Sequence, residues 1–166
     1  IIPLKNTYVQ GSVLDVGSGA GFPGLVWKIM KPELQVTLLE PTGKRCTFLK
    51  EVISHLHLEN ILVVNERAEE FVVDHRESFD VVTARAVANL NVLSELCVPL
   101  VKVGGYFYAL KGAKGKEEEL SASKAMTILG MELKEEEHYT LPSGERVNLI
   151  YVKVKPTDKK YPRNYG

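Results

Sequence analysis

A glycine-rich loop with an acid in front of it is the strongest chemical signal in the sequence. Residues Asp15 to Gly21 read Asp-Val-Gly-Ser-Gly-Ala-Gly and follow a short apolar run. Glycine adopts positive φ angles and lets a ligand approach the backbone closely. After the first parallel strand, such a loop faces the crevice in which open α/β folds bind ligands. Gly17 and Gly19 are therefore candidate cofactor-binding residues, and Asp15 can orient the loop or bind an ammonium group through water.

The spacing of the glycines narrows the choice of ligand. The dinucleotide fingerprint is Gly-x-Gly-x-x-Gly, whereas this loop reads Gly-x-Gly-x-Gly and has Phe22 at the place of the third glycine. No Gly-Lys-Ser or Gly-Lys-Thr follows, so the loop is not a Walker loop. Both a nicotinamide dinucleotide and S-adenosylmethionine fit a loop of this kind, and the spacing favours S-adenosylmethionine.

Acidic residues follow the second and third apolar runs. Glu40 ends the second run, and an acid at that place accepts hydrogen bonds from ribose hydroxyls. The alternative is an exposed acid that begins a loop. Ala68 and Glu69 come after the third run, where they can flank an adenine ring and reach its amine. Spacing alone favours a different interpretation of Glu69, as a solvated acid at a helix start that the helix dipole stabilises.

The elements that must position these residues alternate between strand and helix along most of the chain. Short connections between them predict a parallel sheet covered by helices on both faces. Two extended segments near the end, residues 131–140 and 146–155, are joined by too few residues for a crossover helix, so they form a hairpin with one antiparallel strand. The other expected strands are 12–16, 35–39, 61–64, 79–84 and 106–110; the helices are 23–30, 44–57, 89–100 and 114–129.

Composition limits the class of protein. The 166 residues fit one domain, and 21 basic side chains balance 21 acidic ones, so nucleic acid is not bound by bulk positive charge, although a local basic patch is possible. The apolar runs are too short to span a membrane, and no secretory signal is visible. Two cysteines within regular segments fit a reducing, cytoplasmic setting. The four histidines have no metal-ligand spacing, so no metal is expected.

Five longer motifs run through the chain. They are the segments 15–24 (DVGSGAGFPG), 40–45 (EPTGKR), 79–86 (FDVVTARA), 108–112 (YALKG) and 160–163 (KYPR). The glycine loop alone indicates only a class I methyltransferase, whereas the motifs together are family-specific. They resemble one family, the bacterial small-subunit ribosomal RNA guanine-N7 methyltransferases, also known as glucose-inhibited division protein B.

The resemblance implies a class I fold with a seven-stranded sheet and methyl transfer from S-adenosylmethionine to N7 of one guanine in the 530-loop region of 16S rRNA. It also implies that Gly17, Phe22 and Arg85 contact the cofactor, that Ala68 and Glu69 flank the adenine, and that Glu40 binds the ribose. Residues 1–10 are then the remnant of an N-terminal segment, 11–155 the methyltransferase domain, and 156–166 a basic tail on the surface.

Two cations after later strands have more than one interpretation. Arg85 can form a salt bridge to Glu69 or Asp15, or it can bind the cofactor carboxylate or an RNA phosphate, since its fork suits oxyanions. Lys111 matches a family lysine on the substrate side, where it can contact guanine O6 or a phosphate; a lysine that merely caps a strand is the alternative. RNA contacts are expected from local clusters of basic residues, with Tyr161 stacking on a base. The alternative is that these clusters are only solvated surface. The basic residues are 44–45, Lys111, Lys114, Lys116, Lys159, Lys160 and Arg163.

The main hypothesis is therefore a monomeric RNA base methyltransferase that acts on 16S rRNA or the small ribosomal subunit. Three alternatives remain at this point. They are a methyltransferase of a small molecule or protein, a nicotinamide-dependent reductase, and an RNA-binding module without catalysis.

Overall fold

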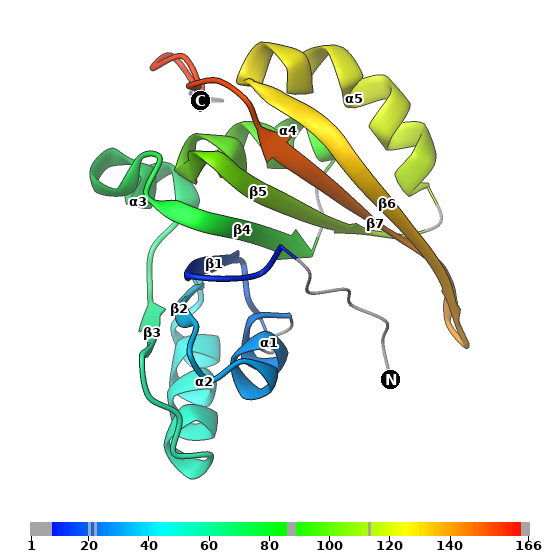
Figure 1. Ribbon diagram of the computed structural model, residues 1–166. Coiled ribbons are helices and arrows are strands. Elements are labelled where there is room, and N and C mark those ends of the chain that lie inside the picture. The colour runs from blue at the N-terminus through cyan, green and yellow to red at the C-terminus, as the bar shows by residue number, and fades with distance from the viewer. Residues whose placement is uncertain (1–7, 20, 22, 86–88, 113, 164–166) are drawn as a thin grey trace.

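The computed structural model is built around one seven-stranded sheet (Figure 1). It describes residues 8–19, 21, 23–85, 89–112 and 114–163. The strands lie in the order β3-β2-β1-β4-β5-β7-β6; β1 to β5 pair in parallel, and β7 runs antiparallel to both of its neighbours, β5 and β6. The predicted fold class and terminal hairpin are thus confirmed. The strands are β1 (Ser12–Val16), β2 (Gln35–Leu39), β3 (Ile61–Val64), β4 (Phe79–Arg85), β5 (Val101–Lys111), β6 (Met131–Leu141) and β7 (Gly144–Lys153).

Helices cover both faces of the sheet, as the alternating pattern predicts. Helices α1 and α2 pack on one face through Leu25, Trp27 and Leu49, and α3, α4 and α5 pack on the other (Figure 1). The helices are α1 (Gly24–Met30), α2 (Gly43–His55), α3 (Ala68–His75), α4 (Leu90–Cys97) and α5 (Gly115–Leu129), with a 3-10 turn at Val98–Leu100.

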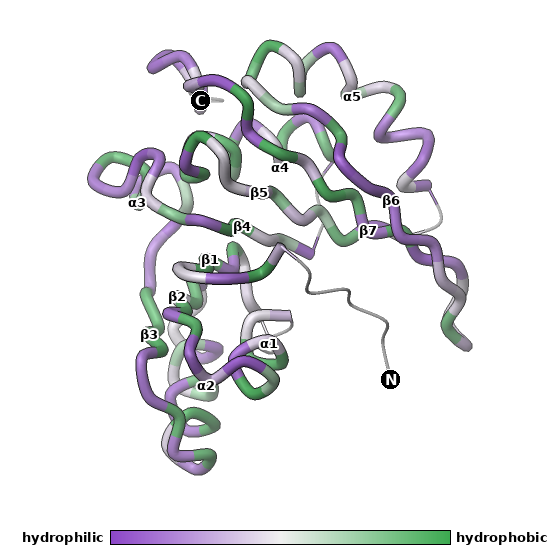
Figure 2. Tube along the Cα trace, viewed as in Figure 1, coloured by the Kyte–Doolittle hydropathy of each residue, from purple (hydrophilic) through white to green (hydrophobic). Residues whose placement is uncertain are grey.

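The hairpin strands differ in hydropathy because they occupy different places in the sheet. Figure 2 shows β6 as largely hydrophilic and β7 as largely hydrophobic. β7 lies between β5 and β6, and its Leu149, Ile150 and Tyr151 are buried. β6 is an edge strand, where charged side chains discourage pairing with another chain. The hairpin therefore carries its charge on the outer strand.

The strand predicted at residues 106–110 is longer than expected, because Gly104 and Gly105, a glycine pair typical of a turn, both lie within β5. That strand begins at Val101 rather than at residue 106. The pairing with β4 passes from Phe79↔Val101 directly to Val81↔Tyr106, so extra residues bulge out between these pairs. Gly104 has φ +88°, and a Cβ on Gly105 would lie 2.7 Å from the Asp80 carbonyl oxygen. Glycine is thus required by a bulge, and the strand continues through it.

The described part of the C-terminal segment is mostly exposed, and hydrogen bonds and an ion pair attach it to the domain. The Arg76 guanidinium donates hydrogen bonds to the carbonyl oxygens of Tyr161 (2.8 Å) and Asp158 (2.7 Å). The guanidinium of Arg163 forks onto the Glu95 carboxylate of α4 at 2.9 and 3.0 Å. The positive charge of Arg163 is therefore paired within the protein, which argues against the predicted RNA contact at this residue.

Candidate cofactor and substrate site

The predicted site residues gather at one edge of the sheet. Gly17 follows β1, Glu40 follows β2, and Ala68 begins α3 soon after β3. Arg85 ends β4 and Lys111 ends β5. Because β1 to β5 are parallel, their carboxyl ends share one edge (Figure 1), which is where open α/β folds bind ligands.

The glycine loop is hydrogen-bonded to the end of β2, and the space beside its backbone at Gly17 holds no atoms of the residues that the structure describes. The amides of Gly17 and Ser18 both donate to the Leu39 carbonyl oxygen, at 2.8 and 3.2 Å. Gly17 has φ +68°, and a Cβ there would meet no atom within 4 Å. Only the backbone conformation demands glycine at this position, and the space beside it is available to a ligand.

Glu40 joins the glycine loop to the start of α2. Its carboxylate is buried and accepts hydrogen bonds from the amides of Gly19 (3.1 Å, Oε1) and Thr42 (2.7 Å, Oε2). Arg45 lies 3.8 Å from the same Oε1 and is largely exposed. The alternative of an exposed acid is wrong. Each carboxylate oxygen has a second lone pair, so the group can still accept ribose hydroxyls, and ribose binding stays a prediction.

Asp15 lies fully buried beneath the loop. Its Oδ2 accepts the Gly24 amide at 2.9 Å, which ties the end of β1 to the start of α1 and fits the predicted loop-orienting role. Oδ1 has no hydrogen-bond partner among the residues that the structure describes. Burial raises the pKa of Asp15 from 3.8 to about 8, while the charge of Arg85 acts in the opposite direction. The other predicted role of Asp15, binding of an ammonium group through water, stays a prediction.

The raised pKa of Asp15 predicts a pH-dependent stability. Between about pH 4 and 8 the folded state binds more protons at this group than the unfolded state does, so the free energy of unfolding should fall as pH rises through this window. The slope is at most about 1.4 kcal/mol per pH unit. Asp15→Asn keeps an acceptor for the Gly24 amide but cannot titrate. Urea unfolding at several pH values should therefore give a shallower slope for the variant, and equal slopes would contradict the raised pKa.

The remaining cofactor candidates line the same edge but differ in exposure. Ala68 is buried at the start of α3, and Glu69 beside it is exposed. Arg85 is exposed at the end of β4, and its positive charge partly offsets the rise that burial causes in the pKa of Asp15. Phe22 lies outside the described residues. Contact of any of these residues with a cofactor remains a prediction.

Lys111 is buried, which the sequence did not indicate. Its side chain is 4% exposed, and its Nζ lies 2.8 Å from Oε1 of Glu118 on α5. The contact with guanine O6 or phosphate stays a prediction. The sequence does not single out Glu118, because it belongs to the run Lys114-Gly-Lys-Glu-Glu-Glu119, which is typical of a solvated helix face.

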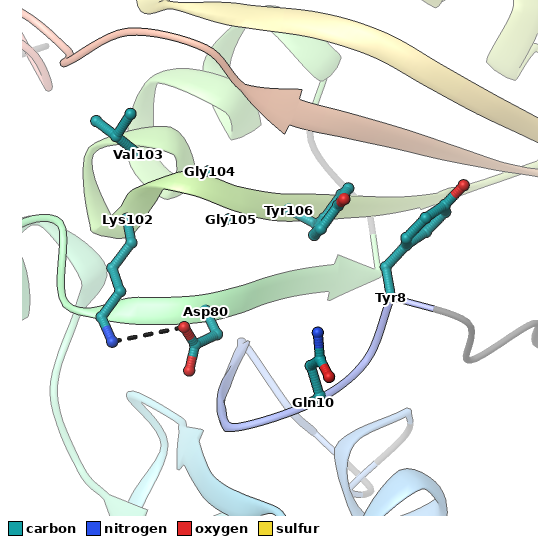
Figure 3. Close-up of a pocket in the computed structure, with 8 residues that line it drawn as sticks. All are labelled: Tyr8, Gln10, Asp80, Lys102, Val103, Gly104, Gly105 and Tyr106. Atoms are coloured by element: carbon teal, nitrogen blue, oxygen red, sulfur yellow. Dashed lines mark hydrogen bonds and ion pairs between the residues drawn. The ribbon is translucent and has the colours of Figure 1, made fainter.

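A small pocket of about 180 Å³ lies at the opposite edge of the sheet, where β4 and β5 begin (Figure 3). Asp80 and Lys102 form an ion pair at 3.5 Å on one side of it, and Tyr8 stacks on Tyr106 with ring centroids 4.6 Å apart on the other. None of the predicted cofactor residues lines this pocket. It is therefore separate from the candidate site.

No helix within the described ranges is both long and apolar enough to cross a membrane.

Comparison with known proteins agrees with this geometry. Residues 2–147 match the family model described as rRNA small subunit methyltransferase G. Proteins named ribosomal RNA small subunit methyltransferase G from Lysinibacillus sphaericus and Thermotoga neapolitana are 54% and 49% identical to this chain. The alignments cover 93% and 100% of this chain and 67% and 73% of those relatives.

A solved structure with a similar fold is a mutant 16S rRNA (adenine(1408)-N(1))-methyltransferase with cosubstrate S-adenosylmethionine, from Catenulisporales acidiphilia. Its TM-score is 0.73 at 16% sequence identity, and the match covers 92% of this chain and 89% of that one. At this identity the likeness concerns the fold alone.

Proposed function

Because this chain belongs to the rRNA small subunit methyltransferase G family, we propose that it transfers the methyl group of S-adenosylmethionine to N7 of a guanine in 16S rRNA. The single observation that supports this most directly is Glu40, a buried acid at the end of β2 that contacts the glycine loop. It stands where an acceptor for a nucleoside sugar is required. The specific guanine, in the 530-loop region, follows from the family.

Each candidate site residue is assigned to a different part of the cofactor. Gly17 and Gly19 present open backbone, Glu40 accepts the ribose hydroxyls, and Ala68 lies beside the adenine. The buried Asp15 carboxyl binds the amino group of the methionine part through water, and the Arg85 guanidinium binds its carboxylate. When bound, S-adenosylmethionine supplies a methyl group on a positively charged sulfur.

Methyl transfer to guanine N7 requires the protein to position the reacting atoms and does not require a general base. Guanine N7 has a free lone pair at neutral pH, so no side chain has to remove a proton before the N–C bond forms and the S–C bond breaks. Holding the reacting atoms in line is worth about 7–11 kcal/mol in well-oriented systems. This explains why no set of serine, cysteine and histidine nucleophiles is needed at this edge.

Exposed cations at the carboxyl edge are proposed to receive the RNA backbone. Lys44 and Arg45 lie in the first turn of α2 beside Glu40, and Lys114 immediately precedes α5. Lys116 pairs with Glu119 and Glu136 and is less available. The protein acts as a monomer, and the reaction takes place in the cytoplasm, where the ribosomal substrate is found.

The test is methyl transfer with labelled S-adenosylmethionine to naked 16S rRNA and to small ribosomal subunits. We expect label in one of these substrates, recovered as N7-methylguanine after digestion. Label in another base or only in a small molecule or protein would contradict the proposed substrate. Cofactor binding without transfer to either RNA form would favour a non-catalytic RNA-binding module.

A further inference from the structure

Glu118 of α5 connects the end of β5 to the beginning of α4. It lies in the first turns of α5, and its Oε1 is 2.8 Å from the Lys111 ammonium at the end of β5. The same oxygen accepts a hydrogen bond from the amide of Leu90 at 3.1 Å. Leu90 is the first residue of α4. One carboxylate therefore links the end of β5 to the beginning of the helix that follows β4.

The beginning of α4 needs such an acceptor. The first amides of a helix have no partner within the helix, and they form the positive end of its dipole. Asn89 satisfies the amide of Asn91 with its own side-chain oxygen at 2.9 Å. Glu118 satisfies the amide of Leu90 and adds a negative charge at the positive helix end. The position of α4 thus depends on a residue from another helix.

Close packing at the start of α5 keeps Glu118 within reach of Lys111 and Leu90. Gly115, the first residue of α5, lies so near to β5 and β7 that an added Cβ would overlap the side chain of Val147 and lie 2.9 Å from the Cβ of Lys111. The absence of a side chain lets α5 begin directly against these strands. Glu118, which comes three residues later on the same helix, then reaches the buried ammonium of Lys111.

We propose that Glu118 is a positioning residue for methyl transfer. By holding Lys111 and the Leu90 amide together, Glu118 fixes the end of β5 against the beginning of α4, at the carboxyl edge of the sheet where Arg85 ends β4. This inference rests on the function proposed above. Lys111 then acts through its ion pair and not through contact with guanine. A displacement of about 1 Å in such a site reduces the rate by as much as about 100-fold, so we expect the main effect in kcat.

The test compares Glu118→Gln with Glu117→Gln, a matched control at the neighbouring, exposed position of the same helix. In Glu118→Gln, we expect kcat for 16S rRNA to fall about tenfold, while KM for RNA and Kd for S-adenosylmethionine change less than about twofold. Glu117→Gln should match the wild type in all three quantities. Glu118→Asp keeps the charge on a shorter arm and should restore part of kcat.

Lys111→Met, made alone and together with Glu118→Gln, separates positioning from direct contact. If Lys111 acts through Glu118, Lys111→Met lowers kcat in the wild type but adds little to Glu118→Gln. Equal losses in both backgrounds, or full kcat in Glu118→Gln, would overturn the inference. Should Glu118→Gln fail to fold, Glu118→Asp takes its place in the same comparison. A wild type that binds the cofactor but methylates no RNA would instead refute the proposed function.

Discussion

Replacing Glu40 with alanine is expected to weaken the binding of S-adenosylmethionine by about 100-fold or more. The change removes the proposed ribose acceptor and also frees the Gly19 and Thr42 amides that the carboxylate holds. A hydrogen bond to a charged group is worth about 1.5–3 kcal/mol, and each 1.4 kcal/mol is about tenfold in affinity, so two lost ribose bonds give about this factor. Calorimetric titration of the folded variant measures the change in Kd.

Two further variants show which part of the effect belongs to the ribose. Glu40→Gln keeps the side-chain shape and one acceptor oxygen, so its Kd should fall between those of the wild type and Glu40→Ala. Glu51→Ala changes an exposed acid on the same α2 and should leave Kd unchanged. A folded Glu40→Ala protein that binds within about threefold of the wild type would remove this acid from the cofactor site.

The sequence could place the candidate site at one edge of the sheet, because this placement follows from topology alone. Strands that alternate with helices place their carboxyl ends together, so the ends of β1, β2, β4 and β5 had to share an edge. The residues at those ends, such as Glu40 and Arg85, could then be identified by type. The spacing of the loop glycines favoured S-adenosylmethionine as the nucleoside ligand, and the family motifs implied the same cofactor.

The side-chain partners could not be predicted in the same way. Periodicity and turn residues report on local conformation, whereas an ion pair depends on which distant groups meet after folding. Glu118 in a charged run, and Arg163 in a basic tail, both resemble solvated surface residues. Only the packing of α5 on β5, and of the tail on α4, gives Glu118 and Arg163 their partners. The bulge in β5 was missed because a pair of glycines is typical of a turn as well.

Lys153 is a further buried cation, and its partner Glu77 is predicted to be important for stability. The Lys153 side chain is fully buried at the end of β7, with its ammonium 2.8 Å from Glu77 and hydrogen-bonded to the carbonyl oxygens of Val98 and Val101. Burial lowers the pKa of Lys153, and Glu77 opposes that shift. Glu77→Ala leaves this charge without its carboxylate, which should lower the free energy of unfolding by about 3 kcal/mol, as measured by urea denaturation.

The double variant Glu77→Ala with Lys153→Met tests whether the loss comes from the uncompensated charge. Methionine fills a similar volume without a charge, and replacing both members of a buried pair is often close to neutral. The double variant should therefore be more stable than Glu77→Ala alone, although Glu77 also accepts the Thr157 amide at 3.3 Å and that bond is not restored. Glu132→Ala, at an exposed position of β6, serves as the control and should change stability little. If Glu77→Ala costs less than about 1 kcal/mol, water or the two carbonyl oxygens suffice to hold the ammonium, and the carboxylate is not needed for the fold.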